Sequence, residues 1–207
     1  MKRSSASFAY TIFIFMWGLV LLSCAEIFAQ TTGTFTDTRD NRVYNWVKQG
    51  KQTWMAENLK VADTVGSWAY NGDDSVHVSI YGRLYDWKSA LKACPKGWHL
   101  PSEKDWSRLI EFLGPEVAGI AMQSFDTVGK TIEEKEMSNI MPISLLLSGV
   151  RYPDGRCLYV TYWGGCWSST AVNDSMAVNY LFARKTGTIG ASTNDKRTGF
   201  SVRCIKK

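Results

Sequence analysis

Aromatic and amide side chains that could bind a sugar gather toward the C-terminal end of the chain. Four rings lie close together, at Tyr152, Tyr159, Tyr162 and Trp163. Flat rings cover the apolar face of a pyranose, while amide and carboxylate groups bind its hydroxyls. With the two Asn-Asp pairs that follow the rings, the predicted ligand-binding residues are Tyr152, Tyr162, Trp163, Asn173, Asp174, Asn194 and Asp195.

The competing interpretation is that these rings belong to the hydrophobic core. Tyr159 and Tyr162 are an odd number of residues apart, so in a regular strand they point to opposite faces. Both rings therefore cannot face inward, and at least one is predicted to lie outside the core or on a loop. For the other rings both interpretations stay open.

Other reactive residues are better explained by structure than by catalysis. His99 stands between two apolar residues, which favours a core position. Glu103 and Asp105 follow a serine at the start of a predicted helix, where such side chains cap the helix and complement its dipole. Ser168 and Ser169 lack the GxSxG turn of a serine nucleophile, and the chain has only two histidines to act as a base. The sequence therefore predicts a protein that is not an enzyme.

The N-terminus predicts export. A short positive start, Lys2-Arg3, precedes an uncharged apolar segment over residues 8–22. This segment has the length of a signal-peptide core and is shorter than the roughly 20 apolar residues of a transmembrane helix. We therefore expect residues 1–29 to be a signal peptide and the mature protein to be exported.

Two cleavage schemes are open for this signal peptide. Residues 21–24 (LLSC) resemble a lipobox, in which residues 1–23 are removed and Cys24 is lipidated. Ala29 before Gln30 instead resembles an ordinary signal-peptidase site. The first scheme predicts a cell-envelope lipoprotein whose only contact with the membrane is its lipid, and the second predicts a secreted protein.

Four further cysteines are expected to form disulfides. Cys94, Cys157, Cys166 and Cys204 are an even number, as in proteins of an oxidising compartment, and they allow three pairings. None belongs to a CxxC motif, and few histidines are present. A structural zinc site is therefore not expected.

Composition and charge predict one domain without affinity for nucleic acid. Residues 30–36 are small and polar and are predicted to be a linker, which leaves residues 37–207 as a single domain. The formal net charge is +5, and no basic run occurs. Nucleic acid is therefore not an expected partner.

Periodicity predicts an α+β domain. Residues 43–55 resemble a hairpin, residues 56–82 are rich in loop-forming residues, and apolar spacing predicts helices at 83–93 and 102–113. Residues 115–142 have weak periodicity and are predicted to be irregular. Strands are predicted at 143–150, 157–162, 165–169, 177–183 and 199–205. In such a domain the first and last strands are expected to pair.

Five motifs, in this order, resemble a known family. They are GKQTWMAENL at 50–59, YGRLYDW at 81–87, CPKGWHLPSEKDW at 94–106, CWSST at 166–170 and GFSVRC at 199–204. The set resembles the Fibrobacter succinogenes major paralogous domain, a family of secreted or lipoprotein bacterial domains, over most of the mature chain. The resemblance implies a C-type lectin-like fold, related to the formylglycine-generating-enzyme type of module. In that fold two helices flank antiparallel strands and the termini pair. It implies no settled biochemical activity.

The resemblance also bears on the cysteines and on calcium. In the implied fold Cys94 and Cys204 lie on neighbouring elements, so a Cys94–Cys204 disulfide is expected. The spacing of Cys157 and Cys166 fits a second disulfide at the end of a hairpin. Sugar-binding C-type lectins often hold Ca²⁺ through an Asn-Asp strand and a Glu-Pro-Asn-like loop, and that loop is absent here. Ordinary turns at the two Asn-Asp pairs are therefore favoured over a calcium site, and no metal or other cofactor is expected.

The motif positions are expected to determine the fold and not a binding site. They are Trp54, Glu57, Asn58, Leu59, Gly82, Trp98, Pro101 and Trp106.

The predicted function is binding at the cell envelope, through the loops at 152–175 and 190–196. The ligand is expected to be a polysaccharide or a surface protein. The alternative is a structural subunit of a surface assembly, which would bind only protein partners.

Overall fold

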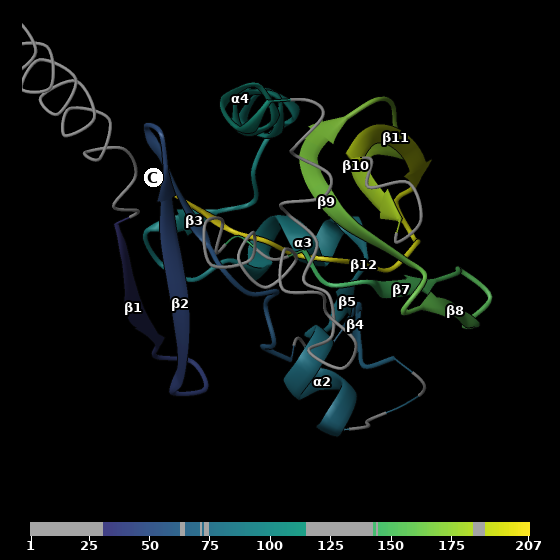
Figure 1. Ribbon diagram of the computed structural model, residues 1–207. Coiled ribbons are helices and arrows are strands. Elements are labelled where there is room, and N and C mark those ends of the chain that lie inside the picture. Colours follow the sequence, from purple (N-terminus) through teal and green to yellow (C-terminus); the bar gives the residue numbers. More distant parts are fainter. Residues whose placement is uncertain are drawn as a thin grey trace, which may run out of the picture. The chain divides into compact units, whose positions relative to one another are not determined.

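The computed structural model describes residues 31–62, 65–70, 72, 75–114, 143, 145–183 and 189–207. From Thr32 to Lys207 these residues form one unit with thirteen strands and three helices (Figure 1). The predicted signal peptide with Cys24, and the segment 115–142, lie outside the described residues.

The first sheet joins the two ends of this unit. Its strand order is β1-β2-β3-β13-β6, and all neighbouring strands are antiparallel. Ile205 pairs with Trp54 on one side and with His99 on the other, so the C-terminal strand lies inside the sheet. The strands are β1 (Thr32–Asp37), β2 (Arg42–Gln49), β3 (Gln52–Met55), β6 (Trp98–His99) and β13 (Ile205–Lys206).

The second sheet forms most of the C-terminal half. Its order is β11-β10-β9-β12-β5-β4, and Figure 1 shows it curled at the β9–β10–β11 end. All pairs are antiparallel except β12 with β9. The strands are β4 (Ser67–Trp68), β5 (Leu84–Tyr85), β9 (Trp163–Ala171), β10 (Met176–Ala183), β11 (Ile189–Asp195) and β12 (Phe200–Ser201).

A separate hairpin lies beside the second sheet. It consists of β7 (Ser148–Arg151) and β8 (Cys157–Val160), which pair antiparallel. Two backbone hydrogen bonds attach it to the sheet: the Arg151 amide donates to the Gly199 carbonyl at 3.0 Å, and the Gly199 amide donates to the Arg151 carbonyl at 2.7 Å. The hairpin is therefore held beside the start of β12, an interior strand of the sheet.

Three helices are described: α2 (Ser75–Tyr81), α3 (Trp87–Ala93) and α4 (Glu103–Leu113). The predicted helix at 102–113 is confirmed as α4. Its N-terminus has the expected capping box, in which Ser102 Oγ accepts from the Asp105 amide and Asp105 Oδ2 accepts from the Ser102 amide at 2.9 Å. These contacts satisfy amides that would otherwise be left unpaired at the helix start.

The expected fold class, an α+β C-type lectin-like fold with two helices flanking antiparallel strands, is wrong. The described part is mostly β, with several sheets and only short helices. The helix predicted from residue 83 begins at Trp87, because the Asp86 side chain accepts from the Ser89 amide at 2.7 Å and caps α3 there. Leu84 and Tyr85 instead pair with β12. Helix α2 was missed within a predicted loop region.

Three boundaries are corrected as well. Residues 30–36, predicted to be a linker, contain most of β1, whose Phe35 ring stacks on Trp98 with ring centroids 4.6 Å apart. The predicted loop at 190–196 is almost entirely strand β11. The predicted strand at 199–205 is divided between β12 and β13.

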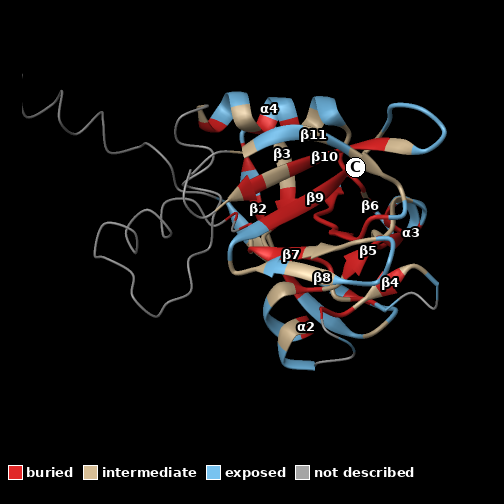
Figure 2. Ribbon diagram, turned by 90° about the vertical axis from the view of Figure 1, so that its right-hand side faces the viewer, coloured by how far each residue is buried: buried red, intermediate tan, exposed pale blue. Residues whose placement is uncertain are grey.

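The motif residues build the interior. Trp54, Leu59 and Trp106 have no exposed surface, and Figure 2 shows the strands around them, including β9 and β10, as largely buried. At the centre lies the fully buried guanidinium of Arg203, which donates to Asn58 Oδ1 at 2.7 Å and to the Met55 carbonyl at 3.2 Å. Residues from the first and last motifs therefore hold each other in place.

Candidate functional site

A pocket of about 290 Å³ lies between the β7–β8 hairpin and the second sheet. Five segments that are distant in sequence contribute to it, so it forms only when hairpin and sheet come together. The hairpin side consists of Gly149, Val150, Tyr152 and Tyr159, and the sheet side consists of Trp163, Gly164, Leu181, Asn194 and Phe200.

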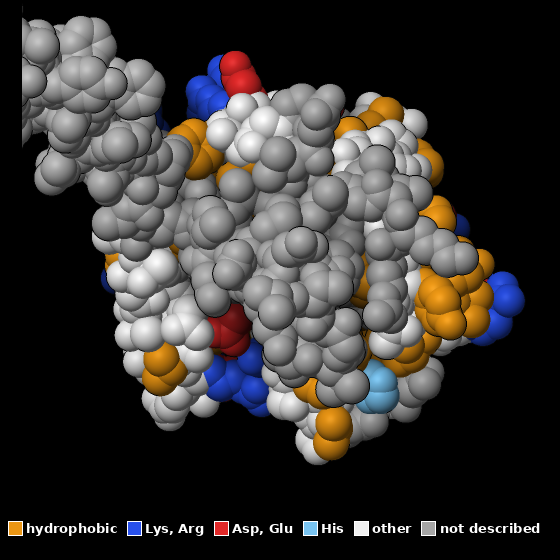
Figure 3. All heavy atoms as spheres, in the orientation of Figure 1, with side chains coloured by type: hydrophobic (Ala, Val, Ile, Leu, Met, Phe, Trp, Pro, Cys, Tyr) orange, Lys and Arg blue, Asp and Glu red, His pale blue; other side chains and the backbone are white. Residues whose placement is uncertain are grey.

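Aromatic rings occupy the exposed side of this pocket. Tyr159 and Trp163 are each 49% exposed, and their ring centroids lie 6.2 Å apart at an angle of 41°. Phe200, at 3% exposed, belongs to the buried side. Figure 3 shows hydrophobic side chains, a class that includes tyrosine, gathered over the β7–β8 hairpin beside basic side chains.

Tyr152 lies close to Tyr159 and shares a hydrogen bond with it. Burial of the Tyr152 hydroxyl, together with the nearby Tyr159 and the hydrogen bond between them, raises the pKa of Tyr152. The Tyr152 phenol therefore stays neutral near pH 7 and can donate or accept a hydrogen bond at the rim.

The turn of the hairpin positions Tyr152. The Gly155 amide donates to the Tyr152 carbonyl at 2.9 Å, and the Tyr152 amide donates to the Arg156 carbonyl at 2.8 Å. Gly155 has a φ of +94°, a conformation that glycine adopts without strain. Residues 152–155 therefore form the turn that joins β7 to β8.

The backbone beyond β8 is unusual. Tyr159 and Thr161 both have a φ of 69°, and this left-handed conformation is costly for residues with a Cβ, especially a β-branched one. The chain turns at these residues between β8 and β9, and Tyr159 and Trp163 on either side of the turn both line the pocket. Tyr162 does not line it and is 63% exposed. The prediction that at least one of Tyr159 and Tyr162 lies outside the core is confirmed.

The polar side of the pocket is formed by amides. Asn194 Nδ2 donates to Asn179 Oδ1 at 2.8 Å and lies 3.5 Å from Ser192 Oγ. Asn179 is fully buried on β10 directly behind Asn194, and its Nδ2 makes no hydrogen bond to the described part of the chain. This corner therefore holds a buried donor that lacks an acceptor.

Sequence reasoning found three of the residues that line the pocket, Tyr152, Trp163 and Asn194. Among the other predicted ligands, Asn173 stabilises a turn, since its Oδ1 accepts from the amides of Ser175 and Met176 at 3.0 and 2.9 Å. Tyr162, Asp174 and Asp195 also lie outside the pocket. Hydrogen bonds from Arg197 lower the pKa of Asp195 to about 2.

Several residues in and behind the pocket were not predicted from the sequence. Val150, Leu181 and Phe200 look like ordinary core residues in the sequence, so no local signal marked them. Asn179 did carry a signal, because it is the one polar residue in the otherwise apolar β10 segment MAVNYLFA.

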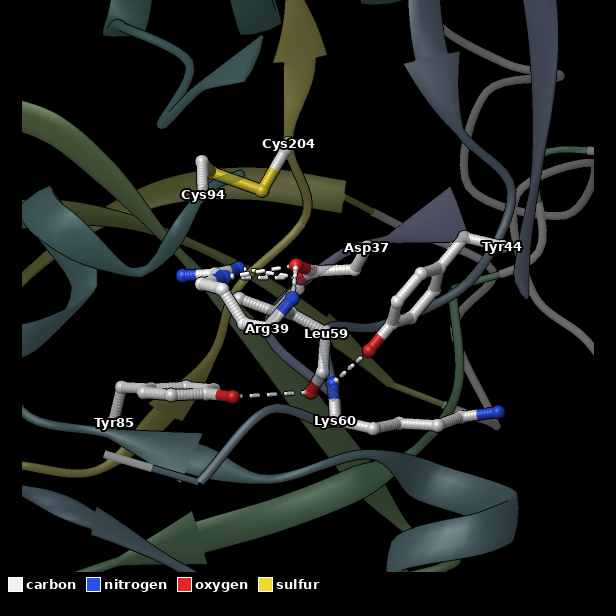
Figure 4. The surroundings of a disulfide bond; sticks show 8 residues. All are labelled: Asp37, Arg39, Tyr44, Leu59, Lys60, Tyr85, Cys94 and Cys204. Carbon is white, nitrogen blue, oxygen red and sulfur yellow. Dashed lines mark hydrogen bonds and ion pairs between the residues drawn. A yellow bond between two sulfur atoms is a disulfide. The ribbon is translucent and has the colours of Figure 1, made fainter. Parts of the chain in front are cut away.

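The predicted Cys94–Cys204 disulfide is present and joins the end of α3 to the segment before β13 (Figure 4). Close to it, Asp37 is paired with Arg39, and Tyr44 Oη accepts from the Lys60 amide at 3.0 Å. The predicted second disulfide is not formed. Cys157 and Cys166 are free thiols, since Cys166 is enclosed within β9 with no exposed surface.

The residues considered for catalysis have structural contacts. Asp105 belongs to the capping box of α4. Ser168 is buried in β9, where its Oγ accepts from the Thr170 amide at 3.1 Å. His99 pairs with Ile205 in the first sheet.

The described residues contain no group of three or more His, Cys, Asp or Glu side chains arranged to hold a metal ion. None of the helices from residue 75 to 113 has the length and apolar composition to cross a membrane.

Comparison with known proteins identifies a family. No curated protein and no solved structure is detectably similar to the chain. The sequence pattern of the Fibrobacter succinogenes major domain, in contrast, matches residues 47–206. This range covers all five motifs and every residue of the pocket. The chain therefore belongs to the Fibrobacter succinogenes major domain family.

Proposed function

We propose that this chain is an exported binding module of the bacterial cell envelope that recognises a polysaccharide. One observation carries the proposal: the half-exposed rings of Tyr159 and Trp163 stand at a pocket whose polar corner is Asn194. Rings of this kind stack on the apolar face of a pyranose, and an amide beside them binds a polar substituent of the sugar.

The size of the pocket supports recognition of a single sugar residue of a longer chain. Its volume of about 290 Å³ lies at the lower end of the range for small-molecule sites, roughly 300–1,000 Å³. The rest of a polysaccharide would pass over the exposed rings. The left-handed backbone at Tyr159 supports this role, since such strain is concentrated at binding and catalytic sites.

Export and anchoring are part of the proposal. The apolar segment at 8–22 supports a signal peptide, and the LLSC sequence at 21–24 supports lipidation of Cys24. Labelling with a radioactive fatty acid should mark the wild-type protein and not Cys24→Ser. An unlabelled wild type that is released from the cells would favour cleavage after Ala29.

Glycan binding is the decisive test. The purified chain, with the Cys94–Cys204 disulfide formed, is applied to a broad panel of plant and microbial polysaccharides, with calcium and with chelator. Trp163→Ala and Tyr159→Ala are expected to weaken selective binding about tenfold or more, because each removes a stacked ring. Tyr162→Ala is the matched control, since this ring is more exposed and lies outside the pocket.

Two results would contradict the proposal. One is a folded protein that binds no glycan in the panel. The other is binding that Tyr162→Ala weakens as much as Trp163→Ala does. Sensitivity to chelator would instead reveal a calcium site, which the sequence does not favour.

A second candidate function is a structural subunit of a surface assembly. The observation behind it is that β1 and β11 stand at the edges of their sheets, and an edge strand can pair with a strand of another protein. Self-association, or recovery with envelope proteins after crosslinking, together with no glycan preference, would support this alternative.

A further inference from the structure

The polar corner of the pocket offers a ligand one hydrogen-bond acceptor, the side-chain oxygen of Asn194. Asn194 directs its Nδ2 at Asn179 Oδ1, 2.8 Å away, so its Oδ1 is left to accept a hydrogen bond from a ligand. Asn179 is fully buried and does not line the pocket, so a ligand does not reach its side chain. Its role is to fix the orientation of the Asn194 amide through this hydrogen bond.

Asn179 belongs to the pocket side of β10. Side chains alternate along a strand, so Asn179 and Leu181 share a face, and Leu181 lines the pocket. The neighbouring strand agrees, because Asn194 both lines the pocket and contacts Asn179. The Asn179 side chain therefore lies directly behind the lining and not on the opposite face, where Tyr180 packs into the core with Trp106.

The remaining surface of the pocket is unsuited to a sugar with a hydroxyl on every carbon. Val150, Leu181 and Phe200 offer no hydrogen bond from their side chains. A hydroxyl pressed against them would lose its water without gaining a partner. The site instead suits a substituent that combines an apolar end with one hydrogen-bond donor.

We propose that the pocket selects N-acetylated sugars by binding their acetamido group. The acetamido N–H donates to Asn194 Oδ1, which Asn179 holds in place from behind, and its methyl packs against the Leu181 and Phe200 side chains. The pyranose ring lies on Tyr159 and Trp163. This inference rests on the proposed glycan-binding function and names the class of sugar that the site would take.

The test compares pairs of glycans that differ only in this substituent. The purified chain, with its disulfide formed, is titrated with an N-acetylglucosamine hexamer and with cellohexaose. A second pair presents N-acetylgalactosamine and galactose on the same polymer. We expect at least about tenfold tighter binding of the N-acetylated member of one pair, the difference that one well-placed hydrogen bond makes.

Variants then assign the selectivity. Asn194→Ala should reduce this preference to near twofold, while Trp163→Ala should weaken both members of a pair equally. Tyr162→Ala should leave affinity and preference unchanged. Asn194 lies on an edge strand and is partly exposed, so its replacement is expected to leave the fold intact. Urea denaturation of each variant checks that it is folded.

The outcomes separate this inference from the proposed function. Equal binding of both members of each pair, with loss in Trp163→Ala, would overturn acetamido selectivity and leave glycan binding intact. A preference that persists in folded Asn194→Ala would overturn the role of the amide pair. Binding of none of these glycans, together with binding of another polysaccharide, would also overturn the inference. No binding to any glycan at all would overturn both.

Discussion

At the residue scale, the most unusual feature is a buried charge in the last motif. Arg203 has no exposed surface and donates to Asn58 Oδ1 and to the Met55 carbonyl. Burial lowers the pKa of its guanidinium to about 10, so it is still charged at physiological pH. An arginine is suited to this position because its planar group donates in several directions at once.

Arg203→Lys is therefore expected to be destabilising even though it keeps the charge. A lysine cannot reproduce both donations, so one acceptor is left unpaired, at a cost of about 1–3 kcal/mol in the free energy of unfolding. Urea denaturation measures this difference. Arg197→Lys is the control, since Arg197 pairs with Asp195 at the surface and is 76% exposed. Equal stability of Arg203→Lys and wild type would show that the buried contacts contribute little.

Asp37 should contribute to stability in a pH-dependent way. Burial of its carboxyl opposes ionisation, but the hydrogen bonds and charge of Arg39 outweigh burial and lower the pKa of Asp37 below its usual value. A lowered pKa in the folded state means that the contribution is present above the unfolded value, about 3.9, and is lost as the pH falls through the folded value.

Asp37→Asn should therefore reduce stability at pH 7 by about 1 kcal/mol, a figure discounted because Arg39 is 38% exposed. As the pH falls from about 4 through the lowered pKa of Asp37, the variant and the wild type should converge. Denaturant titrations from pH 2 to 7 give both curves. Asp154→Asn is the control, because the Asp154–Arg156 pair is exposed and no change is expected. A constant difference at all pH values would contradict the assignment.

At the scale of elements, capping and crosslinking determine where the chain turns. Asp86 starts α3, and Cys94 at its end is joined to Cys204 before β13. This disulfide therefore connects α3, which lies between β5 and β6 in the chain, to the start of β13, which lies between β3 and β6 in the first sheet.

Removing this disulfide should be costly because it closes a long loop. The two cysteines are 110 residues apart, which corresponds to about 4–5 kcal/mol in the chain-entropy description. The double variant Cys94→Ala, Cys204→Ala should lose about this amount in urea denaturation. Cys157→Ala should be nearly neutral, since Cys157 is a half-buried free thiol. A large loss in Cys157→Ala would indicate that this cysteine is paired after all.

The remaining thiols should differ in reactivity. Burial raises the pKa of the Cys166 thiol to about 12, so it is protonated and shielded. Iodoacetamide is expected to label Cys157 in the folded protein and Cys166 only after unfolding. Mass spectrometry of peptides, with and without urea, distinguishes the two. A disulfide-linked peptide that contains both cysteines would contradict the structure.

At the scale of the whole molecule, the first sheet extends to an N-terminal strand that sequence reasoning placed in a linker. Phe35 of β1 stacks on Trp98 and Tyr44, with ring centroids 4.6 and 5.6 Å away. The folded unit accordingly begins at Thr32.

A chain that begins at Thr32 should therefore be as stable as one that begins at Gln30. A chain that begins at Asp37, the boundary predicted from the sequence, should lose at least about 2 kcal/mol because the Phe35 ring no longer covers its neighbours. Thermal and urea denaturation compare them. Phe35→Ala in the longer chain serves as the control for the ring alone. Equal stability of all chains would mean that β1 is dispensable.

Local signals were enough to identify much of this protein from its sequence. Turn residues predicted the β2–β3 hairpin, capping residues predicted α4, and five ordered motifs predicted the family and the Cys94–Cys204 disulfide. Ring and amide chemistry singled out Tyr152, Trp163 and Asn194, which line one pocket in the structure. Each of these inferences depends either on residues that are close together in sequence or on the ordered motifs, which can be compared directly with those of a known family.

Tertiary structure alone decided the fold class, the second cysteine pair and the rest of the pocket. Strands of two residues, such as β5 and β12, have no periodicity of their own and form because distant segments pair. The left-handed backbone at Tyr159 cancels the alternation from which side-chain directions were inferred. Asn179, Leu181 and Phe200 become part of a site only when the β7–β8 hairpin docks on the second sheet, because no local sequence specifies which distant surfaces meet.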